Sequence, residues 1–195
     1  MKISFYTLWR RKIRILFLII SSFTENGKYF FGACCKVCRK KPCRFYADCR
    51  EKWKKLWDGQ EVVFIEGKNT RMGVGNDLFS NTKSIRRIIG PAENAFDNWK
   101  ELLHEAKKIE KSALFILALG PTATVLSYEL AKAGYRALDL GHIDVEYEWF
   151  LKHDYLVAIQ GKYTNEVQGG NKVEECEDEE YKKQIVYSTY WKEKK

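Results

Sequence analysis

The stretch ALFILALGPTATVLSYELAKAGYRALDLG, residues 113–141, decides the fold of this 195-residue chain. Its first part, ALFILALG, is an uninterrupted apolar run such as a central parallel strand needs, because both faces of that strand are buried. Pro121 and the threonines after it favour a helix start, and Gly134 favours the helix end. YRALDLG follows as a second strand candidate, so the stretch predicts a strand–helix–strand unit of the kind that holds nucleotides.

Similar patterns flank this unit. EVVFIEG (61–67), SIRRIIG (84–90) and DYLVAIQG (154–161) are further strand candidates. The segment 94–112 carries apolar side chains at positions 95, 96, 99, 102, 103, 106 and 109, the spacing of an amphipathic helix. Strands that alternate with helices indicate an α/β fold, here a Rossmann-like, mostly parallel sheet flanked by helices.

Charge and cysteine content divide the chain near Trp57. Residues 1–60 hold 15 Lys and Arg against 4 Asp and Glu, a net charge of +11, whereas the remainder carries −3. We therefore predict a basic, cysteine-containing amino-terminal extension over residues 1–52 and a Rossmann-like domain over residues 53–195. Because the predicted domain is mildly acidic and the basic part has no nucleic-acid-binding motif, nucleic acid is not an expected partner.

The amino-terminal segment LWRRKIRILFLIISSF, residues 8–23, places a basic cluster before a short apolar run. The run is too short to span a membrane, which takes about 20 residues, and no signal-peptide cleavage site follows it. We therefore predict a cytoplasmic protein. The segment fits weak contact with the inner face of the membrane, an amphipathic or buried element that packs on the domain, or a remnant of a longer amino-terminal half.

The extension also contains a cysteine cluster. Cys35 and Cys38 form one Cys-x-x-Cys, and Cys43 and Cys49 would complete four sulfur ligands for a zinc ion. The second pair matches no common zinc-motif spacing, and no histidine lies nearby. Reduced thiols without a metal are the alternative.

The turn Gly120-Pro121-Thr122-Ala123-Thr124 lies between a predicted strand and a predicted helix start. Unpaired backbone N–H groups and the positive end of the helix dipole meet there, which favours a diphosphate. Glycine lets a ligand approach the backbone, and the hydroxyls of Thr122 and Thr124 can donate to phosphate oxygens. The alternative is a threonine helix cap that binds nothing.

A second candidate ligand loop, EGKNTRMGVGND (66–77), combines three glycines with Lys68, Arg71 and Asp77. It matches neither the P-loop nor the Gly-x-Gly-x-x-Gly pattern. Arg71 can neutralise a phosphate, and Asp77 can accept from a hydroxyl or orient Arg71.

The densest polar cluster is DLGHIDVEYEWF (139–150), directly after a predicted strand. Asp144 and Glu146, two residues apart, resemble the acidic pairs that hold Mg²⁺ or Mn²⁺ on a nucleotide diphosphate. Either carboxylate can instead take the proton of an acceptor hydroxyl, or, together with Glu148, simply favour a helix start. His142 has little core-packing value at a strand end, so we take it as a site candidate.

Several of these blocks resemble the carboxyl-terminal portion of the GT-D-fold glycosyltransferases over residues 53–170. They are WDGQEVVFIEG, RMGVGNDLF, IGPAENAF, LALGPTATVLSYELAKAGYRALDLGHIDVEYEWF and GKYTNEV. The resemblance implies a bacterial enzyme with a Rossmann-like core. Such an enzyme transfers a sugar, commonly glucose, from a UDP-sugar to a glycan on a protein or cell-surface polymer, with a divalent metal, Mn or Mg.

The resemblance and the turn chemistry together give the expected site. The candidates for nucleotide-sugar binding are Glu66, Gly67, Arg71, Gly73, Gly75, Asp77, Gly120, Pro121, Thr122 and Thr124. The catalytic candidates are His142, Asp144 and Glu146, of which Asp144 and Glu146 are also the candidate metal ligands. The expected partners are a nucleotide-sugar donor and a glycan or glycoprotein acceptor.

One departure from the family pattern leaves two alternatives open. We expect family members to carry an Arg-x-Gly-Asp-Gly-Glu-like motif, whose Asp-x-Glu pair would bind the metal, in a longer amino-terminal half. No such motif precedes residue 61 in this chain. The alternatives are a catalytically incomplete, nucleotide-sugar-binding remnant and another Rossmann-like nucleotide-dependent transferase.

Overall fold

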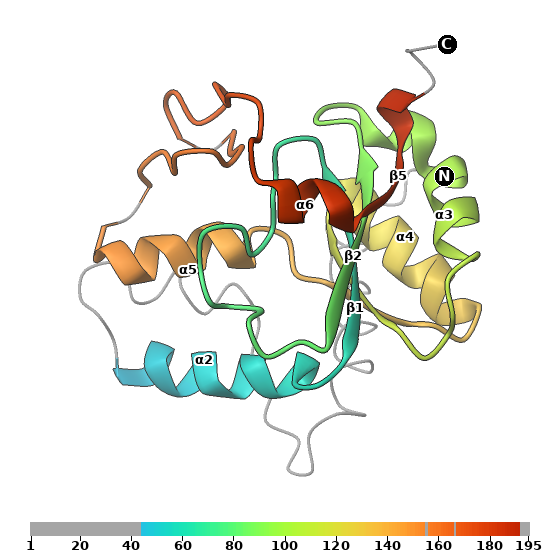
Figure 1. Cartoon of the computed structure of the whole chain (residues 1–195), viewed down its shortest axis with the longest axis horizontal. Coiled ribbons are helices and arrows are strands. Elements are labelled where there is room, and N and C mark those ends of the chain that lie inside the picture. The colour runs from blue at the N-terminus through green and yellow to red at the C-terminus, as the bar shows by residue number, and fades with distance from the viewer. Residues whose placement is uncertain (1–43, 155, 166, 192–195) are drawn as a thin grey trace, which may run out of the picture.

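The computed structural model describes residues 44–154, 156–165 and 167–191. Their helices, 3-10 turns and strands follow in chain order (Figure 1): α2 (Arg44–Trp57), β1 (Glu61–Gly67), β2 (Ser84–Gly90), η2 (Ala95–Asn98), α3 (Trp99–Ala106), β3 (Leu114–Ala118), α4 (Pro121–Lys132), β4 (Arg136–Asp139), α5 (Ile143–Lys152), α6 (Glu179–Gln184), β5 (Ile185–Ser188) and η3 (Thr189–Trp191).

The strands form one parallel sheet in the order β4-β3-β1-β2-β5. Phe64 in central β1 is paired with Arg87 of β2 and Ile116 of β3. All five residues of β3 are buried, as the apolar run predicted. Helix α4 begins at Pro121, and Gly134 follows its end with a φ of +85°, a left-handed conformation that suits glycine. The predicted α/β fold is confirmed.

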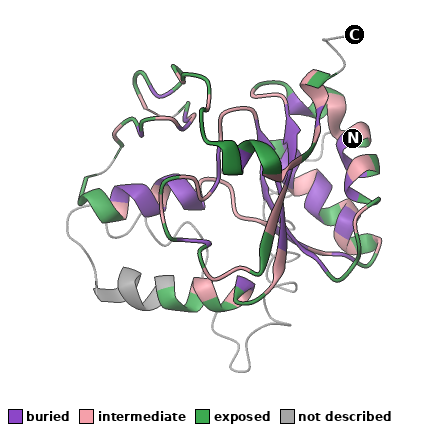
Figure 2. Cartoon of the chain, viewed as in Figure 1, coloured by how far each residue is buried: buried purple, intermediate pink, exposed green. Residues whose placement is uncertain are grey.

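Two layers cover the sheet. Helices α3 and α4 pack on one face, where Val63 and Ile65 of β1 meet Leu102 and Leu126. Helices α2 and α5, together with the long loop after β1, pack on the other face. Figure 2 shows the buried residues concentrated in the strands and on the inner sides of the helices. Both faces of the sheet are therefore covered, as a parallel sheet requires.

Two elements at the carboxyl-terminal end differ from the prediction. The predicted strand over residues 154–161 is wrong, because the residues described there form no strand. Ile159 is buried against Val145 and Trp149 of α5 instead. The sheet gains β5 from the charged tail, and β5 pairs with β2.

The predictions for the amino-terminal extension stay open. The membrane-contact segment and Cys35, Cys38 and Cys43 lie outside the described residues, and the side chain of Cys49 is not described. Helix α2 runs across the predicted boundary between residues 52 and 53, which stays a prediction. No helix within the described ranges is long and apolar enough to cross a membrane.

Trp57 at the end of α2 holds the loop between β1 and β2 against the sheet. Its side chain is fully buried, and its Nε1 donates to the carbonyl oxygen of Leu78 at 2.9 Å. Its ring lies 4.6 Å from that of Phe79, centroid to centroid. This single side chain thus anchors the part of the loop that leads into β2.

We predict that Trp57→Phe lowers the free energy of unfolding by about 1–3 kcal/mol, because it leaves a cavity and an unsatisfied carbonyl. Urea denaturation followed by circular dichroism measures the change. Trp53→Phe, one turn earlier at a half-buried position, is the control and should lower the free energy of unfolding by less. Equal losses in the two variants would contradict the anchoring role.

Candidate functional site

The carboxyl ends of β1 and β3 lie next to each other at the point where the strand order reverses. Strand β2 lies on one side of β1 and β3 on the other. In open α/β sheets, ligands bind outside the carboxyl ends of the strands at such a reversal. The loop that begins at Lys68 and the turn at Gly120 flank this point.

Gly120 forms an open turn at the start of α4. It has φ +53° and ψ −143°, is exposed, and a Cβ added to it would meet no atom within 4 Å. Pro121 is exposed as well, whereas Thr122 is buried. The hydroxyl of Thr124 donates to Asp139 Oδ2 at 2.7 Å and so ties α4 to the end of β4. The turn therefore offers backbone to a ligand at the positive end of a helix.

The glycines of the loop after β1 are of two kinds. A Cβ on Gly67 would come within 3.3 Å of the Pro91 carbonyl oxygen, and one on Gly73 within 2.9 Å of the Phe79 ring. Close packing explains these two glycines. Gly75 is exposed with φ +80°, and nothing lies within 4 Å of an added Cβ. Of the three, Gly75 is the one with open space beside it.

Arg71, the predicted phosphate ligand, joins three segments of the chain. Its Nη1 donates to the Gly161 carbonyl oxygen at 2.9 Å, and its Nη2 donates to Asn69 Oδ1 at 3.2 Å and to the Glu174 carbonyl oxygen at 2.5 Å. The residue is buried. In this arrangement the guanidinium holds the loop to the segment after α5.

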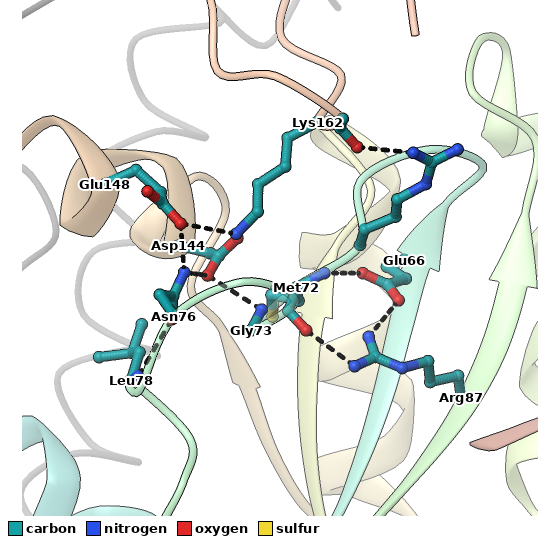
Figure 3. Close-up of polar contacts among 11 residues, drawn as sticks. Glu66, Met72, Gly73, Asn76, Leu78, Arg87, Asp144, Glu148 and Lys162 are labelled. Atoms are coloured by element: carbon teal, nitrogen blue, oxygen red, sulfur yellow. Dashed lines mark hydrogen bonds and ion pairs between the residues drawn. The ribbon is translucent and has the colours of Figure 1, made fainter. Parts of the chain in front are cut away.

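Glu66 forms a buried ion pair with Arg87 (Figure 3). Arg87 Nη1 donates to Glu66 Oε1 at 2.6 Å, and the Met72 backbone N–H donates to Glu66 Oε2 at 2.7 Å. Arg87 also donates to the Met72 carbonyl oxygen at 2.9 Å, and its guanidinium carbon lies 4.9 Å from the centroid of the Phe64 ring and 4.8 Å from that of Tyr181. Burial raises the pKa of the Glu66 carboxyl, against the opposing effect of Arg87.

Asp144 is the centre of a second polar cluster, the Asp144 cluster, in which buried Asp144, Glu148 and Lys162 meet the partly exposed Asn76 (Figure 3). Asp144 Oδ1 accepts from the Gly73 backbone N–H at 2.9 Å and from Asn76 Nδ2 at 2.8 Å. Lys162 Nζ donates to Asp144 Oδ2 at 2.5 Å and to Glu148 Oε1 at 3.3 Å. The cluster fixes the loop after β1 to α5.

The predicted Asp144/Glu146 pair does not fit a divalent metal. Both residues lie in the first turn of α5, where side chains two positions apart point about 200° away from each other. Asp144 already accepts hydrogen bonds at both oxygens, and the Lys162 ammonium repels a second cation. No group of three or more His, Cys, Asp or Glu within the described part of the chain is arranged to hold a metal ion.

His142 and Glu146 lie where the sequence predicted, at the start of α5 and just beyond the carboxyl end of β4. Both are partly exposed. Asp77 lies elsewhere in the loop, and its carboxylate accepts from Lys54 Nζ at 2.7 Å and from the Tyr147 hydroxyl. Asp77 therefore joins the loop to α2 and α5.

Sequence reasoning missed Arg87 and Lys162. Arg87 falls inside a predicted strand, and its partner Glu66 is 21 positions away. Lys162 is 18 positions from Asp144. A charged residue within an otherwise apolar strand is the local sequence signal that indicates a buried ion pair, and Arg87 is such a residue.

Comparisons with known proteins identify the family of the chain. A family model described as "Glycosyltransferase GT-D fold" matches residues 23–167. The chain is 44% identical over 137 residues to "Glycosyltransferase GlyD" of Streptococcus pneumoniae serotype 4 (strain ATCC BAA-334 / TIGR4), covering 70% of this chain and 17% of that protein. It is 41% identical over 136 residues to "Probable glycosyl transferase Gly" of Streptococcus gordonii, covering 69% and 20%.

Comparison with solved structures identifies the same family. "A New Glycosyltransferase (DUF1792) from Streptococcus sanguinis" superposes with a TM-score of 0.69 at 40% identity, over 73% of this chain and 53% of that chain. "The highly conserved domain of unknown function 1792 has a distinct glycosyltransferase fold" gives 0.67 at 41% identity, over 73% and 52%. The chain thus spans about half the length of the solved relatives and a fifth or less of the curated ones.

We predict that Lys162→Met lowers the free energy of unfolding by about 3–5 kcal/mol, because it leaves Asp144 and Glu148 buried without their cation. Urea denaturation at neutral pH measures the loss. Lys132→Met, at the exposed end of α4, is the matched control and should change stability by less than about 0.5 kcal/mol. Similar values for the two variants would show that the Asp144 cluster does not hold the loop.

Asp77 gives a pH-dependent prediction. The hydrogen bonds from Lys54 and Tyr147 lower the pKa of its carboxyl from the ordinary value of 3.8. A carboxyl whose pKa is lower in the folded state than in the unfolded state stabilises the fold at pH values above its ordinary pKa. This contribution to the free energy of unfolding is lost as the pH falls through the folded-state pKa.

Asp77→Asn should therefore reduce stability at pH 7 by at most about 1 kcal/mol, as for an exposed pair. The difference between variant and wild type should shrink as the pH falls below about 4. Urea midpoints across this pH range measure it. A difference that is constant with pH would argue against the two hydrogen bonds.

Proposed function

The chain belongs to the GT-D-fold glycosyltransferase family, and on this premise we propose that it transfers a sugar from a UDP-sugar to a glycan acceptor. Glucose is the proposed sugar, and a glycan on a protein or cell-surface polymer is the proposed acceptor. The open Gly120 turn at the strand-order reversal is the observation that carries the proposal. A cytoplasmic location, with weak contact of residues 8–23 to the inner membrane face, belongs to the same proposal.

The donor diphosphate binds at the start of α4 in this proposal. Gly120 and Pro121 are exposed there, and the missing side chain at Gly120 leaves room for a phosphate against the backbone. Gly75 supplies open backbone from the loop after β1. Glu66, Gly67, Arg71 and Gly73 support the donor site by fixing the shape of that loop.

Transfer requires that the acceptor hydroxyl lose its proton as its oxygen attacks the anomeric carbon and UDP leaves. His142 and Glu146 are the proposed bases, because they lie partly exposed beyond β4 at the same edge of the sheet. The positive end of α4 stabilises the charge that develops on the departing diphosphate. Asp144 acts as a positioning residue through Gly73 and Asn76, and no step is assigned to a metal at Asp144 and Glu146.

A second candidate function is a nucleotide-sugar-binding unit without turnover. The hydrogen bonds that both Asp144 oxygens already accept favour it. Calorimetry with UDP and a turnover assay with UDP-glucose separate the two functions. Binding without turnover supports the second, and binding with turnover supports the first.

We predict that Gly120→Ala weakens UDP binding by about tenfold or more, because the methyl group enters the space proposed for the diphosphate. Titration calorimetry with and without Mn²⁺ measures the affinity. Gly59→Ala is the matched control, since Gly59 also has a positive φ, +62°, and open space around an added Cβ. It lies between α2 and β1, at the opposite edge of the sheet.

Both variants should lose stability, by about 1–2 kcal/mol or more from backbone strain, but only Gly120→Ala should lose UDP. Wild-type affinity in Gly120→Ala would contradict the proposed diphosphate position. No UDP binding by the wild-type chain would remove both candidate functions.

A further inference from the structure

Aromatic side chains gather where the chain leaves β2 and β5. We call this group the aromatic surface; its members are Phe96, Trp99, Tyr187, Tyr190 and Trp191. Phe96 is 55% exposed and Trp191 is 50% exposed, and both are among the most exposed large apolar side chains of the described residues. Trp99, Tyr187 and Tyr190 are partly exposed, and Trp99 and Tyr187 also pack against the core. Aromatic side chains that cluster at a surface in this way are typical of binding surfaces.

Contacts between side chains connect the two parts of this surface. Phe96 of η2 stacks on Trp99 at the start of α3, with 6.1 Å between ring centroids. Tyr187 of β5 contacts Trp191 edge to face at 6.2 Å. The Tyr187 hydroxyl donates to the carboxylate of Glu101, which shares the first turn of α3 with Trp99. The segments η2–α3 and β5–η3 therefore present one surface.

Tyr190 connects this surface to the end of β1, beside the proposed donor site. Its hydroxyl accepts from the Ala92 backbone N–H at 3.3 Å, just past the end of β2. Lys68, the first residue after β1, places its ammonium 4.8 Å from the centroid of the Tyr190 ring. The segments that carry the aromatic surface thus lie at the carboxyl edge of the sheet, where the donor is proposed to bind.

We propose that the aromatic surface binds the acceptor saccharide, an inference that rests on the proposed glycosyl transfer. A pyranose ring has an apolar C–H face, which packs on an aromatic ring, and a rim of hydroxyls, which bind charged and polar groups. Lys68, Lys100 and Glu101 supply such groups among the rings. An apolar protein helix on this surface would take the ammonium groups of Lys68 and Lys100 out of water and offer them no polar partner of its own, which is costly.

The position of the surface suits an acceptor for a second reason. The acceptor hydroxyl must reach the anomeric carbon of the donor, so the two sugars must lie at the same edge of the sheet. The rings of Phe96 and Trp191 do not belong to the apolar core clusters. They can therefore bind a saccharide without loss of core packing.

The test is a titration of the full 195-residue chain with cellobiose, maltose and N,N′-diacetylchitobiose, followed by the indole N–H signals in NMR spectra. At least one disaccharide should shift the Trp99 and Trp191 signals. The double variant Phe96→Ala/Trp191→Ala should weaken that binding by about tenfold. Tyr128→Ala removes an equally exposed aromatic ring, at 47%, from the middle of α4 and should leave the affinity unchanged.

The proposal is overturned by no shift of these indoles with any of the three disaccharides, by wild-type affinity in the double variant, or by an equal loss in Tyr128→Ala. A dimer that sedimentation detects in the wild type and that the double variant abolishes would also overturn it, because a second copy of the chain would then cover the surface. The titration needs no donor. Saccharide binding by a chain that does not bind UDP would support this site and reject only the proposed transfer.

Discussion

Two buried carboxylates hold the loop between β1 and β2, and the rest of the site depends on them. Glu66 accepts the backbone N–H of Met72, and Asp144 accepts that of the next residue, Gly73. Parallel strands are usually joined by a helix that satisfies its own backbone, but this connection has none. The carboxylates provide the acceptors that a helix would have provided.

Each carboxylate needs a cation, because an unpaired buried charge is costly. Arg87 from β2 pairs with Glu66, and Lys162 from the segment after α5 pairs with Asp144. The two pairs connect β1, β2, α5 and the segment after α5 through one loop. Charged residues that look catalytic in the sequence thereby hold the loop in place, while the backbone at Gly75 and Gly120 stays exposed.

The sequence predicts the centre of the fold well and its margins poorly. An unbroken apolar run, a proline at the helix start and a glycine after its end make β3, α4 and β4 recognisable, because each signal is local. The apolar run at 154–161 was misread since Ile159 packs against α5 instead of joining the sheet. Strand β5 has only four residues and lies in a charged tail. It forms because it pairs with the edge of β2.

The candidate site, like the fold, could be predicted only where the sequence signal is local. The open turn at Gly120 could be predicted from its place between a strand and a helix start, and its role in donor binding stays a prediction. The hydrogen bonds and ion pairs of Glu66, Arg71 and Asp144 could not be predicted, because their partners come from distant segments of the chain. The spacing of Asp144 and Glu146 resembled a metal pair in extended chain, but on a helix the two side chains diverge.

In the proposed function, a nucleotide diphosphate binds between the end of β1 and the start of α4. Backbone amide shifts of the labelled chain on titration with UDP test it most directly. The account predicts that the largest shifts fall on residues 120–124 and on the loop around Gly75, with little change in α2 or in the amino ends of the strands. Shifts centred on α2 and the amino ends, with none at Gly120, would contradict the account.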